Sequence, residues 1–157
     1  MSVVVWDGQS LAADRACIVN GSMHTQQKIF QCEHKVVAFV GTHENGLGLL
    51  EWVRKGSHEA QWPIGQTTEE WTVLIVADPF DPKSIYYYER LPIKQYPDCS
   101  VRNFFAWGAG KDYALGALSM GASAAAAVTI ASEFSIHCGF GVDTFLVKPH
   151  VRIGEGA

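Results

Sequence analysis

The residue types that hold metals are present in this chain, but their spacing fits no known metal or cofactor site. The histidines show neither the H-x-x-x-H nor the HExxH arrangement that places two zinc ligands on one helix face. His137-Cys138 is a lone adjacent pair, which is weak evidence for a metal. Gly46-Leu47-Gly48 lacks the third glycine of a dinucleotide-binding turn. We therefore expect neither a metal nor an organic cofactor; the histidines are His24, His34, His43, His58, His137 and His150.

The four cysteines are widely spaced and include no C-x-x-C pair. A disulfide framework is typical of short secreted chains, whereas the first residues here have neither a basic segment nor a long apolar run. We expect a reduced, cytoplasmic protein in which these thiols are mostly buried and free. They are Cys17, Cys32, Cys99 and Cys138.

The chain has 157 residues, 48% of them apolar, and a net charge of −4. This length suits one globular domain, so we expect residues 1–157 to form a single domain with a frayed tail from about residue 149. The acidic and basic residues are well mixed and form no basic stripe, which argues against nucleic-acid binding. The most apolar run, 121–130, is too short to cross a bilayer.

The elements that must position any site follow from apolar periodicity and turn residues. Asp7-Gly8 and Asn20-Gly21 indicate hairpin turns, and the two prolines within 78–82 indicate a turn that bars ladder pairing. One helix is expected over 45–55, and a helical stretch over 111–134 should break at Gly121, with Ser123 as the second N-cap. Strands grouped around helices favour an α+β fold over βαβ repeats. The expected strands are 3–6, 10–18, 27–30, 36–40, 71–77, 85–89, 104–107 and 142–147.

Several segments, taken in order, resemble the proteasome β-subunit family and its bacterial relative, the peptidase subunit of the heat-shock ATP-dependent protease. The strand after Ser2 and its return through 11–15 (Leu-Ala-Ala-Asp-Arg) are similar to the family's N-terminal hairpin. Residues 27–30 resemble its Lys-Ile-Phe segment, and 105–110 resemble its strand ending in Gly-Ser-Gly. The stretches 111–134 and 139–143 resemble its paired helices and glycine-rich entry to a late strand. No segment is specific alone, but their shared order covers the chain from Ser2 to about Val147.

The resemblance implies a four-layer αββα sandwich of the N-terminal nucleophile hydrolases, assembled as a homo-oligomeric ring. It implies that Ser2, once Met1 is removed, is the nucleophile in place of the family's threonine and that its own α-amine is the base. An α-amine has a pKa of about 8, so part of it is neutral and can take a proton. Lys28 and Asp14 match the family's charged pair, and Gly41 matches the backbone N–H that holds the oxyanion. No cofactor is implied, and an ATP-dependent unfoldase is the implied partner for peptide or unfolded protein substrates.

Two positions depart from the family pattern. Ala109 stands where the family has the serine of Gly-Ser-Gly, and Ser135 stands where it often has an aspartate. The leading hypothesis is a proteasome-type serine or threonine peptidase. A non-catalytic structural subunit with the same fold, or an amidase acting on a small substrate, stays open as an alternative. Retention of Met1 would block the free amine and favour the structural subunit.

Overall fold

The computed structural model describes residues 2–63, 72–97 and 103–148. Its strands are β1 (Val3–Trp6), β2 (Ser10–Asp14), β3 (Ala16–Val19), β4 (Ser22–Thr25), β5 (Ile29–Cys32), β6 (Lys35–Val40), β7 (Val73–Asp78), β8 (Asp81–Glu89), β9 (Phe105–Gly108) and β10 (Val142–Leu146). Its helices are α1 (His43–Arg54), the short 3-10 helix η1 (Glu59–Gln61), α2 (Lys111–Ser119) and α3 (Ala124–Phe134).

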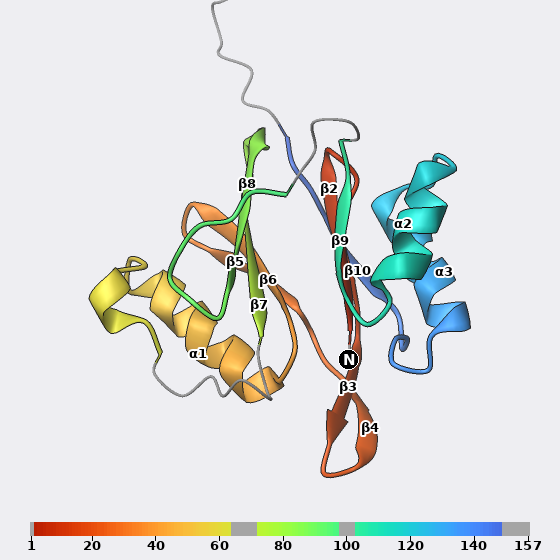
Figure 1. Ribbon diagram of the computed structural model, residues 1–157, viewed down its shortest axis with the longest axis horizontal. Coiled ribbons are helices and arrows are strands. Elements are labelled where there is room, and N and C mark those ends of the chain that lie inside the picture. Colours follow the sequence, from red (N-terminus) through yellow and green to blue (C-terminus); the bar gives the residue numbers. More distant parts are fainter. Residues whose placement is uncertain (1, 64–71, 98–102, 149–157) are drawn as a thin grey trace, which may run out of the picture.

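Two antiparallel four-stranded sheets form the centre of the molecule. One has the strand order β10-β2-β1-β9 and the other has the order β5-β6-β7-β8. Helix α1 lies on the outer side of the second sheet, and α2 and α3 lie on the outer side of the first (Figure 1). Strands β3 and β4 pair only with each other among the described strands and project beyond the first sheet as a two-stranded ribbon. The chain therefore combines sheets and helices as expected for an α+β fold.

The central strands are buried on both faces, which explains their unbroken apolar runs. In β1, Val4 and Trp6 face the other sheet, whereas Val3 and Val5 pack under α2 and α3. Strand β6 alternates in the same way, and Phe39 contributes to the cluster beneath α1. Successive side chains of a strand point to opposite faces, so a strand covered on both sides must be apolar throughout. This confirms the prediction made from residues 36–40.

Both predicted hairpin turns and the predicted helix break are confirmed. Asn20 and Gly21 both have positive φ (51° and 77°), as a two-residue hairpin turn of this kind requires. The helical stretch after Gly110 divides into α2 and α3, and Ser123 caps α3 because its side chain accepts from the Ala126 N–H. Asp7 accepts from the Ala124 N–H at 2.9 Å, so the first hairpin also anchors the start of α3.

The prediction of a single strand over residues 10–18 is wrong, because the segment forms two strands, β2 and β3. Strand β4 was not predicted. The chain leaves the first sheet after Asp14 and enters the β3–β4 ribbon at Ala16. The break has a tertiary cause, because the Arg15 N–H donates to the Gly139 carbonyl while the Arg15 carbonyl accepts from Gln26. These contacts with distant segments bend a sequence whose local pattern favours a continuous strand.

The turn predicted over 78–82 is shorter than expected. Asp78 already pairs with Asp81 across Pro79 and Phe80, so β8 begins four residues before the predicted start at Ile85. The register then shifts, and regular pairing resumes with Ala77 opposite Ile85. Pro82 lies within this irregularity, between the Asp78–Asp81 and Ala77–Ile85 pairs, where a missing N–H is tolerated. The prolines therefore distort the ladder without ending the strand.

Some expectations fall outside the described residues, including those for Trp71, Cys99 and the tail from residue 149. Cys17, Cys32 and Cys138 are free thiols, and the last two are buried as expected. Between α1 and β7, the described part of the chain contains the short helix η1. In the part of the chain that the structure describes, no helix has the length and apolar character needed to cross a membrane.

Candidate active site

Ser2 is held at the start of the most enclosed strand of the molecule. It is 2% exposed, and β1 pairs with β2 on one side and with β9 on the other. The Gly110 N–H donates to the Ser2 carbonyl at 3.3 Å. Gly108 has φ +101°, and a Cβ there would overlap that same carbonyl oxygen. Only glycine satisfies both conditions at Gly108, so this residue sets how closely β9 approaches Ser2.

Asp14 ends β2 with a fully buried carboxylate that accepts hydrogen bonds on both oxygens. Oδ1 accepts from Lys28 Nζ at 2.7 Å and from the Val3 N–H at 3.0 Å. Oδ2 accepts from the N–H groups of Ala16 at 3.3 Å and Gly139 at 3.1 Å. A buried carboxylate is tolerated only when it is paired and hydrogen-bonded, and here both conditions are met. The structure thus brings together Asp14 and Lys28, the two residues that the family resemblance pairs.

Lys28 precedes β5 and is 3% exposed. Its side chain crosses from the edge of the second sheet to the carboxylate of the first, so the ion pair links the two sheets. Ser2 and Lys28 both line a cavity of about 650 Å³. The ammonium is therefore held on the wall of the same cavity that Ser2 borders.

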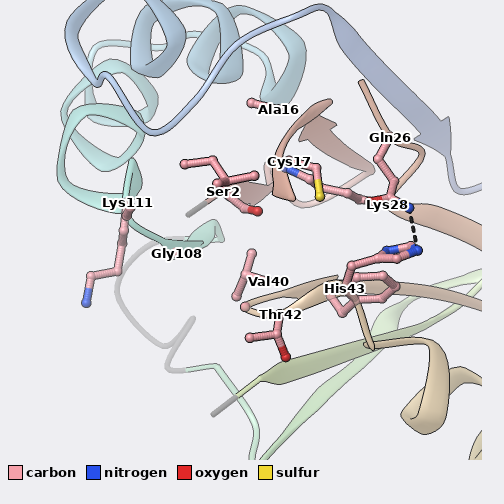
Figure 2. A pocket seen from close by; sticks show the side chains of 14 residues that line it. Ser2, Ala16, Cys17, Gln26, Lys28, Val40, Thr42, His43, Gly108 and Lys111 are labelled. Atoms are coloured by element: carbon pink, nitrogen blue, oxygen red, sulfur yellow. Dashed lines mark hydrogen bonds between the residues drawn. The ribbon is translucent and has the colours of Figure 1, made fainter. Parts of the chain in front are cut away.

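Gly41 joins β6 to α1 and lines the same cavity. Its φ of +122° lies in the region that favours glycine. Figure 2 shows Ser2 and Gly108 bordering the cavity on one side and Val40, Thr42 and His43 bordering it on another. All of the residues proposed from the sequence thus lie at one place, because Asp14 is bonded to Lys28 and the other three line the cavity.

Gln26 and His43 also line the cavity, and sequence analysis did not single them out as site residues. The Gln26 amide nitrogen is in hydrogen-bond contact with His43 Nε2 (dashed in Figure 2). This contact holds the imidazole ring of His43 against the segment that follows β4. Burial lowers the pKa of His43 below its ordinary value of 6.5. The residues are 17 positions apart, and no local motif marks either of them.

Cys138 lies near Asp14, on the turn between α3 and β10 that also contains Ser135. Burial, and then the Asp14 charge, raises the pKa of the Cys138 thiol, while a hydrogen bond from Ser135 and the Lys28 charge act in the opposite direction. The thiol is therefore protonated at neutral pH and packs as an apolar group. Ser135, at the position where the resemblance led us to expect an aspartate, bonds within its own turn through the His137 N–H at 3.3 Å.

Among the described residues, no group of three or more His, Cys, Asp or Glu side chains is placed to hold a metal ion. The chemistry that this cavity offers is that of a hydroxyl residue beside a buried ammonium and a glycine backbone. Such a set can carry nucleophilic acyl transfer, in which a hydroxyl attacks a carbonyl and an N–H group stabilises the oxyanion.

No protein-family model and no curated protein sequence matches this chain. Solved structures do match. Thiobacillus denitrificans BPH in complex with epoxomicin is 21% identical with a TM-score of 0.69, over 95% of this chain and 100% of that one. Eukaryotic HslV from Trypanosoma brucei is 15% identical with a TM-score of 0.68, over 94% of this chain and 98% of that one. This chain has the proteasome/HslV fold.

The proteasome/HslV fold confirms the family resemblance at the level of architecture, since the match extends over nearly the whole of both chains. At these identities the likeness concerns the fold alone. The assignment of a reaction to the cavity therefore rests on the residues of this chain and is made below as a proposal.

The Asp14–Lys28 pair predicts a large loss of stability when one partner is removed. Replacing Lys28 by Met leaves a buried carboxylate without its counter-ion and should lower the free energy of unfolding by about 3–5 kcal/mol. In the double variant Asp14→Asn/Lys28→Met, the loss of unfolding free energy should be smaller than the sum of the losses in the two single variants. The reason is that each single change leaves one buried charge without its partner, whereas the double variant has neither charge. Urea unfolding of the variants measures both quantities.

The matched control for Lys28 is Arg54→Gln, which removes a half-exposed pair with Glu51 at 3.8 Å. That change should cost about 0–1 kcal/mol. A Lys28→Met loss no larger than the control, or losses in the double variant that add within about 0.5 kcal/mol, would show that the buried pair does not support the fold.

His43 predicts a pH dependence of stability. Because burial lowers its folded-state pKa, the unfolded chain binds more protons as the pH falls through 6.5, and stability should fall with it. His43→Gln should remove this part of the pH dependence, whereas His24→Gln, on an exposed strand, should leave it unchanged. Thermal unfolding of the three proteins from pH 8 to pH 5 measures it, and identical profiles for wild type and His43→Gln would contradict the assignment.

Proposed function

We propose that this chain is a proteasome/HslV-type peptidase whose nucleophile is Ser2 after removal of Met1. The observation that carries the proposal is that Ser2, Lys28 and Gly41 border one cavity of about 650 Å³ while Asp14 holds Lys28 from behind. A cavity of this size accepts side chains and backbone of a peptide. The proteasome/HslV fold supports the same reading.

The proposed reaction is acyl transfer in two steps. Ser2 Oγ attacks the carbonyl carbon of the peptide bond, and its proton passes to the Ser2 α-amine. The C–N bond breaks as the leaving amine takes that proton, which leaves an ester on Ser2 Oγ. Water then attacks the ester and gives a proton to the α-amine, and Ser2 Oγ leaves with that proton to restore the hydroxyl.

The neighbouring groups have separate roles in this proposal. The Lys28 ammonium favours the neutral form of the Ser2 α-amine and the developing negative charge on Oγ through its positive charge. Asp14 is a positioning residue, because it bonds both to Lys28 and to the Val3 N–H that follows Ser2. The Gly41 N–H is the donor for the oxyanion, and the absence of a Cβ lets substrate approach it closely.

The finer features of the resemblance belong to the same proposal. We propose one domain over residues 1–157 in a four-layer αββα sandwich of the N-terminal nucleophile type, assembled as a homo-oligomeric ring in the cytoplasm. Unfolded protein is the proposed substrate, delivered by an ATP-dependent unfoldase. A chamber that admits only unfolded chains separates this function from an amidase acting on a small molecule.

A non-catalytic subunit is the second candidate, and Ala109 favours it. Ala109 lines the cavity where the resemblance led us to expect a serine hydroxyl. Without that hydroxyl, one hydrogen-bond partner for the proposed amine base is lost. A chain that kept Met1 would fit this second candidate, since the α-amine of Ser2 would then be part of a peptide bond.

Substitution of the nucleophile separates the two candidates. Ser2→Ala should lower hydrolysis of fluorogenic peptides at least about 10³-fold, because no hydroxyl remains to form the ester. Ser2→Thr is the control, since it keeps both the hydroxyl and the amine on one residue. Intact mass should show that Met1 is absent from the active preparations.

Equal hydrolysis by wild type and Ser2→Ala would overturn the assignment of the nucleophile. A chain that retains Met1 and hydrolyses none of a broad set of peptides would favour the structural subunit. Both outcomes leave the fold unaffected.

A further inference from the structure

A second cavity lies on the α1 side of the molecule and shares no lining residue with the candidate active site. Its volume is about 360 Å³. It is bordered by the β5–β6 turn, the end of α1, strand β8 and the loop that follows β8. We name it the Tyr86 pocket after one of the buried side chains that line it.

The charges that border the Tyr86 pocket are mainly positive, although the whole chain has a net charge of −4. Lys35, Arg54 and Lys94 line it, together with His34. Among the described lining residues the acidic side chain is Glu33. Arg54 also pairs with Glu51 at 3.8 Å, but both side chains are about half exposed, so this pair is weak. The local balance favours an anionic ligand.

Two lysines converge on the Tyr86 ring. Lys35 Nζ donates to Tyr86 Oη at 3.0 Å, and Lys94 Nζ lies 4.5 Å from the ring centre. Because Oη accepts from Lys35, the phenol hydrogen is directed elsewhere and can donate to a ligand. The same two ammonium groups repel a cationic ligand from the ring. Tyr86, Lys35 and Lys94 together therefore present donors and positive charge.

The position of the Tyr86 side chain is set by the sheet. Tyr86 is 7% exposed and pairs with Val76 across the β7–β8 ladder. Its ring packs edge to face against Tyr88 at 5.7 Å. Burial, together with Tyr86 and Tyr96, raises the pKa of Tyr88 to about 12, so this second phenol stays neutral and adds no negative charge. The Tyr86 hydroxyl is thus held in place before any ligand binds.

Part of the pocket wall is apolar. Cys32, Val53 and Tyr88 are all buried and border the same cavity. We propose that the Tyr86 pocket binds a small organic oxyanion, with a carboxylate or phosphate against Lys35, Lys94 and the Tyr86 hydroxyl and an apolar body against this wall. Charge-assisted hydrogen bonds supply the affinity, and the apolar wall selects against an inorganic ion alone.

Binding of four small probes tests the proposal without reference to peptidase activity. Phenyl phosphate and 3-phenylpropionate carry the two anion chemistries on an aromatic body, 3-phenylpropanol is the uncharged counterpart, and inorganic phosphate lacks the body. We expect saturable amide NMR shifts at Tyr86 and Lys94 with one or both aromatic anions. Both 3-phenylpropanol and inorganic phosphate should bind at least about tenfold more weakly than the better aromatic anion.

Variants test the named donors. We expect at least about tenfold weaker binding of the better aromatic anion in each of three variants, Lys35→Gln, Lys94→Gln and Tyr86→Phe. The thermal stability of the two lysine variants should be unchanged. Lys83→Gln is the matched control, since Lys83 is an exposed lysine of β8 that does not border the pocket.

The proposal is overturned by any of three results. These are no saturable shift at the pocket with either aromatic anion up to about 10 mM, equal binding of 3-phenylpropanol, or an effect of Lys83→Gln as large as that of Lys35→Gln. If one anion binds and the other does not, the proposal stands and the anion chemistry is identified.

Discussion

The arrangement of this molecule depends on the hydrogen bonds and the ion pair of one buried carboxylate, that of Asp14. Its four hydrogen bonds reach Val3 at the start of β1, Ala16 at the start of β3, Lys28 before β5 and Gly139 before β10. A charge with no exposed surface must have such partners, because water does not reach it. The requirement to satisfy one carboxylate therefore brings together four segments that are distant in sequence, and it places Ser2 and Lys28 beside the same cavity.

The sequence predicts the elements whose pattern is set by burial or by local chemistry. Apolar runs identify β1 and β6 because these strands are covered on both faces. Ser123 and Gly121 divide the long helical stretch because capping and the positive φ of glycine act within a few residues. Such features depend on neighbours along the chain and need no knowledge of the fold.

The wrong or missing predictions share one cause, because the contacts that decide the structure there come from residues distant in the sequence. Residues 10–18 read as one strand, but Arg15 is turned by bonds to Gln26 and Gly139. Asp14 and Lys28 are not among these wrong or missing predictions, but their pairing rests on the family resemblance, since nothing in the local pattern distinguishes a buried lysine from a surface one. Gln26 and His43 were not predicted as site residues because their contact exists only once the start of α1 lies beside the segment that follows β4.

The proteasome/HslV fold and the Asp14 network make the Ser2 nucleophile the central proposal for function. The measurement that tests it most directly is an experimental structure of the protein after treatment with a peptide epoxyketone, a reagent that bonds to an amine and a hydroxyl of one residue. We expect continuous density from both N and Oγ of Ser2 to the inhibitor, with its peptide in the cavity beside Lys28 and Gly41. An unmodified Ser2 in a chain that retains Met1, or an inhibitor bonded to another residue, would contradict this function.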